Sequence, residues 1–222
     1  MNMTENRKPK TENPIIRLRL FFTGVGGQGT LLASRVLGEA ALEAGFSPLV
    51  SETHGMAQRG GIVVSTVVLG EVKSPIISPG EADVLLGFEA LETFRALNYC
   101  HPKSLVIANT AAIPPYPVAI GQAKYPGVGR LMQLLAEQVG GVLAFDAGDR
   151  ARRAGSPLAV NMVLLGALAA SASLPFSDED LRQVLRTRTN PKFLEANLLA
   201  FQSGVDAARA AKNWLKKPGA WH

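Results

Sequence analysis

The sequence predicts an α/β fold of the Rossmann-like class, with a mostly parallel sheet flanked by helices and a helical C-terminal section. From residue 15 onward, short apolar runs alternate with amphipathic segments, as expected for parallel strands joined by crossover helices. A glycine-rich turn, GVGGQG, joins the first apolar run to the first amphipathic segment. After about residue 157 the pattern is helical throughout.

The first part of the chain supplies the predicted strands. Residues 15–23 form the first strand and residues 30–44 the first helix, which ends before Gly45. SPLVSE and GIVVSTVVLG are the next two strands, and a hairpin around Gly70–Glu71 is an alternative that would add an antiparallel element. Strand ADVLLGF, helix EALETFRALNYC, strand SLVIANT, helix VGRLMQLLAEQVG and strand GVLAFDA then follow in order.

Capping signals mark the helices of the C-terminal section. Ser177 with Asp180 three residues later is close to a capping box, and Asn190–Pro191 fits an N-cap followed by proline in the first turn. The apolar segment Leu158–Ala172 is expected to be a helix of the core or of a subunit interface.

The domain organisation is expected to be simple. Residues 1–14 are polar and charged and should form a disordered tail. Residues 15–217 should form a single domain, with an α/β part at 15–156 and a helical part at 157–217.

Composition narrows the class of protein. Charged residues make up 18% of the 222 residues, below the usual share of about 25%. Either a partner covers part of the surface, or a parallel sheet is buried on both faces. The formal net charge of +5 would suit a phosphorylated ligand, but aromatic residues do not interleave with a basic run, so nucleic-acid binding is not expected.

Cysteine usage points to a reducing compartment. Cys100 is the single cysteine, so the chain cannot form an internal disulfide or hold an iron–sulfur cluster by itself. The polar N-terminus is unlike a signal peptide, and the longest apolar stretch contains too many polar residues for a membrane span. A cytoplasmic protein is expected.

The glycine loop is the first candidate site. Its glycines fit G-x-G-x-x-G, which permits a tight turn, the close approach of a phosphate, and close packing of helix on strand. The helix N-terminus adds unpaired N–H groups and the positive end of the helix dipole. A dinucleotide site, a site for another phosphate ligand, and a turn with only a packing role all stay open. The candidate binding residues are Gly24, Gly26, Gly27, Gln28, Gly29 and Thr30.

The second candidate site is SETHGMAQRGG. Glu52 ends the second predicted strand, where a dinucleotide fold places the acid that binds ribose. In a doubly wound sheet the following loop lies beside the glycine loop. There Arg59 could pair with a phosphate, His54 could act as an acid, base or donor, and Gln58 completes the set. A solvated loop, or one that docks a partner chain, is the alternative. We expect neither a catalytic nucleophile nor a metal site.

These two loops together resemble those of a known family. GVGGQGTLLAS with SETHGMAQRGG is similar to the small (beta) subunit of indolepyruvate:ferredoxin oxidoreductase and, more broadly, to the gamma domain of 2-oxoacid:ferredoxin oxidoreductases. The resemblance runs from about Leu18 to Gly204 and includes GEADVLLGFEALE, the IPP at 113–115, NMVLLGA and NPKFLEANLLAFQSG. MAQRGG favours the indolepyruvate (arylpyruvate) branch.

The resemblance implies an oxidoreductase subunit that is inactive alone. Its complex would decarboxylate a 2-oxoacid oxidatively to an acyl-coenzyme A. Thiamine diphosphate, magnesium and iron–sulfur clusters are expected on a larger partner subunit, in a heterodimer or heterotetramer, with ferredoxin reached through the complex. A free-standing NAD(P)- or flavin-binding oxidoreductase and a purely structural assembly subunit are the alternatives.

Coenzyme A is the co-substrate that the resemblance implies for this chain. The glycine loop and Arg59 are candidates to meet its phosphates. Arg150, Arg152 and Arg153 are further candidates, although a solvated turn before a helix is the simpler interpretation of that segment.

Overall fold

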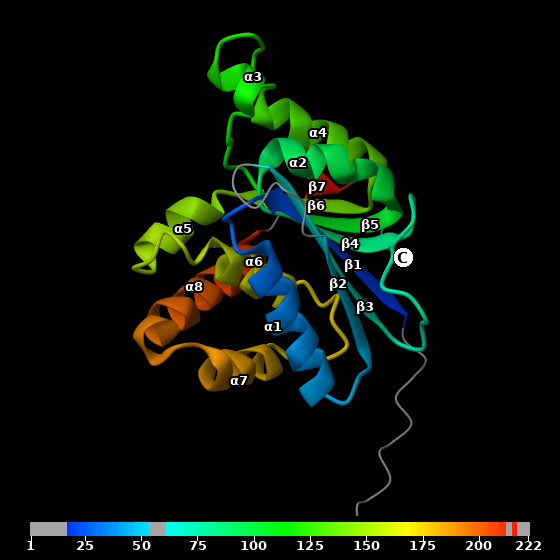
Figure 1. The fold of residues 1–222 in the computed structure, drawn as a ribbon, viewed down its shortest axis with the longest axis vertical. Coiled ribbons are helices and arrows are strands. Elements are labelled where there is room, and N and C mark those ends of the chain that lie inside the picture. The colour runs from blue at the N-terminus through cyan, green and yellow to red at the C-terminus, as the bar shows by residue number, and fades with distance from the viewer. Residues whose placement is uncertain (1–16, 54–60, 212–214, 217–222) are drawn as a thin grey trace, which may run out of the picture.

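The computed structural model describes residues 17–53, 61–211 and 215–216, so the predicted tail at 1–14 lies outside the described residues. Within them, a seven-stranded sheet forms the centre of the molecule (Figure 1) in the order β2-β3-β1-β4-β5-β6-β7. The strands are β1 (Leu18–Val25), β2 (Pro48–Thr53), β3 (Ile62–Leu69), β4 (Ala82–Gly87), β5 (Cys100–Asn109), β6 (Gly141–Phe145) and β7 (Leu215–Lys216).

The middle of the sheet is parallel, as predicted. β1 pairs in parallel with β4, β4 with β5, and β5 with β6. The side chains of these strands alternate between two apolar clusters: Leu20 and Phe22 belong to one, and Phe21 to the other. Because both faces are covered, the strands read as nearly continuous apolar runs in the sequence.

The β2–β3 part differs from a simple doubly wound sheet. β3 is antiparallel to both of its neighbours and lies between β2 and β1. The antiparallel pairs among the described strands are therefore β2–β3, β3–β1 and, at the other edge, β6–β7, and the alternative hairpin around Gly70–Glu71 is wrong. After β3 the chain contains prolines, which cannot donate to a strand ladder, and the Pro75 carbonyl instead accepts a hydrogen bond from Thr66 Oγ1 at 2.7 Å.

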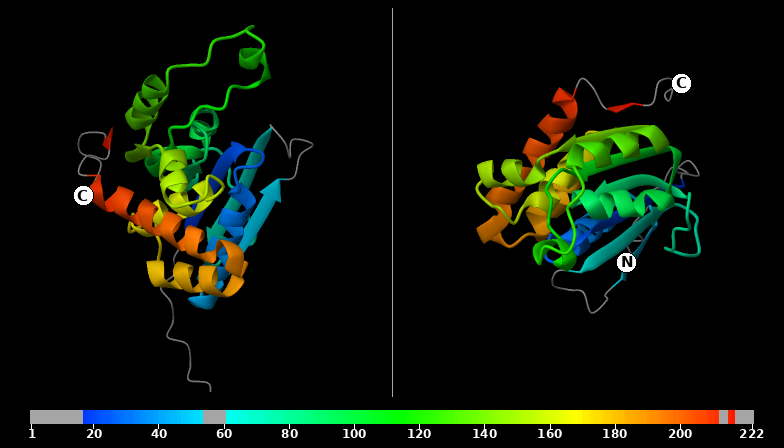
Figure 2. Two further views of the ribbon diagram at one scale, coloured as in Figure 1. Left: turned by 90° about the vertical axis from the view of Figure 1, so that its left-hand side faces the viewer. Right: turned by 90° about the horizontal axis from the view of Figure 1, so that it is seen from above.

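Helices cover both faces of the sheet (Figure 2). On one face lie α2 (Ala90–Arg95), the 3₁₀ turn η1 (Ala96–Tyr99) and α4 (Val128–Gln138). On the other lie α1 (Thr30–Glu43), α5 (Ala147–Arg153), α6 (Val160–Ala169), α7 (Asp178–Arg188) and α8 (Pro191–Ala210). The short helix α3 (Tyr116–Ala119) has no buried residue and stands away from both layers.

The predicted caps of the C-terminal helices are present. Ser177 Oγ accepts from the Asp180 N–H, and Asp180 accepts in return from the Ser177 N–H, which completes the capping box before α7. The Asn190 side chain accepts from the Lys192 N–H at 3.0 Å, and Pro191 begins α8. The division of the chain at residue 157 stays a prediction. None of the helices in the described part of the chain is long and apolar enough to cross a membrane.

Two glycines let α6 and α8 cross in direct backbone contact. A Cβ atom on Gly204 would lie 1.8 Å from the Val163 carbonyl oxygen, and one on Gly166 would lie 1.9 Å from that of Phe201. Both distances are far below van der Waals contact, so neither position accepts a larger residue without separating the helices.

We therefore predict that Gly204→Ala lowers the free energy of unfolding by about 1–3 kcal/mol, as overpacking does in a core. Alanine normally stabilises a helix interior by up to about 1 kcal/mol relative to glycine, and Gly129→Ala in α4, where an added Cβ meets open space, should show that gain. Urea unfolding of the two variants measures this. An unchanged midpoint for Gly204→Ala would contradict the crossing.

Candidate functional site at the carboxyl edge of the sheet

The glycine loop joins β1 to α1 at the carboxyl edge of the sheet. Gly27 has φ +100° and Gly29 has φ +78°, a left-handed region in which other residues are strained. Gly29 is also the N-cap of α1. The Gly26 N–H donates to the Gly61 carbonyl at 2.8 Å, so the loop is fixed to the residue just before β3.

Gln28 holds the loop together from within. Its Oε1 accepts from the Val25 N–H at 2.7 Å, and its Nε2 donates to the Phe88 carbonyl at 2.8 Å. Both the oxygen and the nitrogen of the Gln28 amide therefore form hydrogen bonds within the chain. Gln28 is a positioning residue for the loop in this structure, and its predicted contact with a ligand stays untested.

Asn109, which the sequence analysis did not single out, continues this network across the sheet. Its Nδ2 donates to the same Phe88 carbonyl at 3.0 Å. Its Oδ1 accepts from the N–H groups of Ala111 and Ala147, at 3.2 and 3.0 Å. The sequence held one signal for this role: Asn109 is the asparagine at the end of the predicted buried strand SLVIANT. The ends of β1, β4, β5 and β6 are thus joined by two side-chain amides.

Close packing explains two of the fingerprint glycines. A Cβ on Gly24 would lie 2.7 Å from the Cβ of Phe88, and one on Gly29 would lie 2.5 Å from Nδ2 of Asn161 on α6. The Asn161 Nδ2 also donates to the Gly29 carbonyl at 3.4 Å. Gly24 and Gly29 therefore allow close packing, whether or not the loop also binds a ligand.

The loop still offers donors to an anion. Within the described residues, no hydrogen bond engages the N–H groups of Gly27, Gly29 or Thr30. The first turn of a helix leaves its N–H groups unpaired, and the dipole adds positive potential there. The Thr30 hydroxyl is buried, with no hydrogen-bond partner among these residues. This arrangement fits a phosphate or pyrophosphate group.

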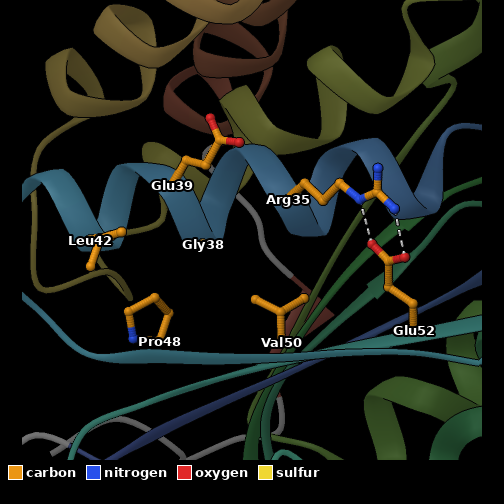
Figure 3. A pocket seen from close by; sticks show the side chains of 7 residues that line it. All are labelled: Arg35, Gly38, Glu39, Leu42, Pro48, Val50 and Glu52. Atoms are coloured by element: carbon orange, nitrogen blue, oxygen red, sulfur yellow. Dashed lines mark hydrogen bonds and ion pairs between the residues drawn. The ribbon is translucent and has the colours of Figure 1, made fainter.

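Glu52 lies in a groove between α1 and β2 (Figure 3), together with Gly38, Glu39, Leu42, Pro48 and Val50. Its two carboxylate oxygens accept from Arg35 Nε and Nη2 at 2.7 and 2.9 Å. Because β3 separates β2 from β1, Glu52 lies two strands, roughly 10 Å, from the strand that carries the glycine loop. This position, and the ion pair with Arg35, argue against the ribose-binding role that the spacing suggested for Glu52.

The other predicted residues of the second cluster, His54, Gln58 and Arg59, lie outside the described residues. The segment begins after β2 and ends before β3, where Val25 pairs with Ile62 and Gly26 bonds to Gly61. Gly61, the last residue of the SETHGMAQRGG cluster, is therefore bonded to the glycine loop, because β3 pairs with β1. The expected proximity of His54, Gln58 and Arg59 to that loop stays a prediction.

The RARR segment forms helix α5 instead of the predicted turn. Arg153 and Arg152 both pair with Asp149 on the same helix, at 2.8 and 3.6 Å. Arg150 Nη1 donates to the Ser203 carbonyl at 3.1 Å, and its guanidinium lies 5.6 Å from the centre of the Phe145 ring. Asp149 therefore partly neutralises Arg152 and Arg153, whereas the contacts given for Arg150 are with uncharged groups.

The single cysteine lies at the opposite edge of the sheet, at the amino end of β5. Cys100 begins β5, whereas the glycine loop meets the ends of the parallel strands. Burial raises the pKa of the Cys100 thiol to about 12, against a smaller lowering by its hydrogen bond with Ser104. The thiol is therefore protonated at neutral pH and is a poor nucleophile.

Comparison with known proteins places the chain in a family. The family model described as pyruvate ferredoxin/flavodoxin oxidoreductase matches residues 19–207. The chain belongs to this family and is a subunit of an oxidoreductase, as its two loops predicted.

Individual relatives refine this result. The indolepyruvate oxidoreductase subunit IorB of Thermococcus kodakarensis is 42% identical over 192 residues, which is 86% of this chain and 95% of the relative. The 2-oxoglutarate synthase subunit KorC of Methanothermobacter thermautotrophicus is 27% identical over 192 residues, 85% of this chain and 94% of the relative.

Solved structures share the fold. The gamma subunit of a keto/oxoacid ferredoxin oxidoreductase from Geobacter sulfurreducens superposes with a TM-score of 0.65 at 24% identity, over 87% of this chain and 99% of that chain. A 2-oxoglutarate:ferredoxin oxidoreductase from Magnetococcus marinus, solved with 2-oxoglutarate, coenzyme A and succinyl-CoA bound, gives 0.66 at 22% identity, over 87% and 31%.

We predict that Gln28→Met, which keeps the volume but removes the amide, lowers the free energy of unfolding by about 1–3 kcal/mol, because the Val25 N–H loses its partner. Gln133→Met on the exposed face of α4 is the matched control and should change stability by less than about 0.5 kcal/mol. Urea unfolding and hydrogen exchange at Val25 report the effect. Unchanged protection of that amide in Gln28→Met would contradict the role of Gln28.

Proposed function

We propose that this chain is the small subunit of an indolepyruvate (arylpyruvate):ferredoxin oxidoreductase complex. The complex converts the 2-oxoacid, by oxidative decarboxylation, to an acyl-coenzyme A and passes the electrons to ferredoxin. The observation that carries the proposal is the 42% identity to an indolepyruvate oxidoreductase subunit along nearly its whole length, against 27% to a 2-oxoglutarate synthase subunit.

In this proposal the redox cofactors belong to a larger subunit. Thiamine diphosphate, magnesium and the iron–sulfur clusters supply the decarboxylation and electron transfer. This chain contains one cysteine, which cannot ligate a cluster by itself, and its GDR at 148–150 departs from the GDG that begins a thiamine diphosphate motif. The complex is cytoplasmic.

The proposed role of this chain is to hold the pyrophosphate of coenzyme A at the glycine loop. The N–H groups of Gly27, Gly29 and the first turn of α1 would donate to the phosphate oxygens, and the Thr30 hydroxyl would gain the partner that it lacks. These donors also suit other nucleotides. The position of Glu52, bound to Arg35 two strands away, disfavours NAD(P) as that nucleotide.

Reconstitution tests the assignment. The isolated chain should be colourless and inactive. With the larger subunit, it should support reduction of ferredoxin or a viologen by an arylpyruvate and coenzyme A, with a higher kcat/KM for indolepyruvate than for pyruvate or 2-oxoglutarate. A yellow chain, binding of NAD(P) or a flavin with micromolar affinity by the isolated chain, or equal activity without it would contradict the proposal.

The Thr30→Val variant tests the coenzyme A site. Removing the hydroxyl should leave the chain at least as stable, because the group is buried without a partner, yet raise the coenzyme A KM of the complex about tenfold or more. Thr66→Val is the matched control: its hydroxyl bonds to Pro75, so stability should fall while the KM stays unchanged. An unchanged KM for Thr30→Val would favour a loop with only a structural role.

A further inference from the structure

An arm between β5 and α4 stands out from the body of the molecule (Figure 2, left). Residues 112–124 form its outer part, with the sequence AIPPYPVAIGQAK, and all of them except Pro115 and Val118 are exposed. Lys124 is the only charged residue in this stretch. Tyr116 is 76% exposed, and Ile120, one helical turn later, is 45% exposed. Apolar side chains exposed together on one projecting segment indicate an interaction site.

The tip of the arm is ordered by its own backbone. The Gln122 and Ala123 N–H groups donate to the Pro117 carbonyl at 2.8 and 3.1 Å, and Gly121, with φ +77°, ends α3. Pro114 and Pro115, in the irregular segment before α3, and Pro117, within α3, fix φ at these positions. An arm that is ordered before it binds loses little conformational entropy on docking.

The buried carboxylate of Glu89 holds the two ends of the arm, near Ile113 and near Tyr125, which we call its first and second foot. Glu89 Oε1 accepts from the Ile113 N–H at 3.0 Å and from the Tyr125 hydroxyl, while its Oε2 caps α2 by accepting from the Glu92 N–H at 2.8 Å. Burial, together with the hydrogen bond to Glu89, raises the pKa of the Tyr125 hydroxyl, so it remains a proton donor at physiological pH. The Leu91 N–H in turn donates to the Tyr125 oxygen at 3.1 Å.

A short chain of hydrogen bonds links the two feet of the arm to the glycine loop. Glu89 directly follows Phe88, whose carbonyl accepts from Gln28 of that loop. Asn109, which bonds to the same carbonyl, also accepts from Ala111 at the first foot. The arm is therefore rooted at the edge of the sheet where the loop presents its donors.

We infer that residues 112–124 are a docking element that inserts into an apolar groove of the larger partner subunit. The choice of partner rests on the proposed function: coenzyme A held at the loop must present its thiol to chemistry on the larger subunit, so that subunit approaches this edge. With a single lysine, the arm has too little charge to steer an acidic electron carrier, and its apolar surface matches the interior of a permanent interface.

The double variant Tyr116→Ala/Ile120→Ala tests the inference in the full-length chain. Both side chains are exposed, so the melting temperature should be unchanged, whereas the dissociation constant for the larger subunit should rise about 30-fold or more. The matched control is Phe193→Ala/Leu199→Ala on α8, 50% and 52% exposed on the opposite layer, which should leave the dissociation constant within about twofold.

Tyr125→Phe tests the hydrogen bond between Tyr125 and Glu89 at the second foot of the arm. It keeps the apolar tip but removes the hydroxyl that bonds to Glu89, so it should increase hydrogen exchange at the Ile113 amide and weaken binding by a smaller factor, about 3–10-fold. The dissociation constant of the unaltered chain for the larger subunit, measured by biolayer interferometry, should differ little between low and high salt, since the arm is nearly uncharged.

The outcomes separate this inference from the function. If the unaltered chain neither binds the larger subunit nor supports its activity, the proposed function fails. If the unaltered chain binds but Tyr116→Ala/Ile120→Ala binds equally well, the arm is not the docking element. A homodimer of the isolated chain, detected by light scattering and lost in that variant, would show that the arm docks on a second copy and would also overturn the inference.

Discussion

The carbonyl oxygen of Phe88 accepts two side-chain amide hydrogen bonds, and the geometry of the candidate site depends on that one atom. One donor is Gln28, from the turn after β1, and the other is Asn109, from the end of β5. The next residue, Glu89, fixes both feet of the arm. Loop, sheet edge and arm are therefore positioned by two consecutive residues after β4, and a shift at Phe88 would move all three together.

This arrangement suits a subunit that binds and positions rather than one that reacts. The polar groups described at the edge are backbone N–H groups, the neutral amides of Gln28, Asn109 and Asn161, a threonine hydroxyl, and a buried carboxylate already engaged by donors. The single thiol begins β5, at the amino end, and its raised pKa keeps it protonated. Oriented N–H groups bind an anionic ligand without changing their own protonation, which is what holding coenzyme A for another subunit requires.

Much of the fold could be predicted from the sequence because local signals and burial agreed. Strands buried on both faces gave continuous apolar runs, and the caps at Ser177 and Asn190 formed as expected. The position of β3 could not be predicted, since its nearly continuous run of β-branched residues suits a parallel or an antiparallel neighbour equally. The arm escaped notice because its short helix makes no buried contact and so leaves no periodic pattern.

The glycine turn lies between β1 and α1, as the sequence predicted, whereas its role as a binding site stays a prediction. The glycine fingerprint identified the turn, whereas the reasons for Gly24 and Gly29 include contacts with Phe88 and Asn161, which come from distant parts of the chain. Glu52 fitted the spacing of a ribose-binding acid, yet strand order, which spacing does not encode, placed it two strands away and against Arg35. Long-range partners such as Asn109 and Asn161 become visible only when the strands are assembled.

We propose that the glycine loop of this chain receives the pyrophosphate of coenzyme A within a larger complex. A structure of the assembled complex with coenzyme A bound tests it most directly. We expect pyrophosphate oxygens within hydrogen-bond distance, about 2.7–3.2 Å, of the N–H groups of Gly27 and Gly29 and of Thr30 Oγ1. Coenzyme A bound wholly by the larger subunit, with the Thr30 hydroxyl still lacking a partner, would contradict it.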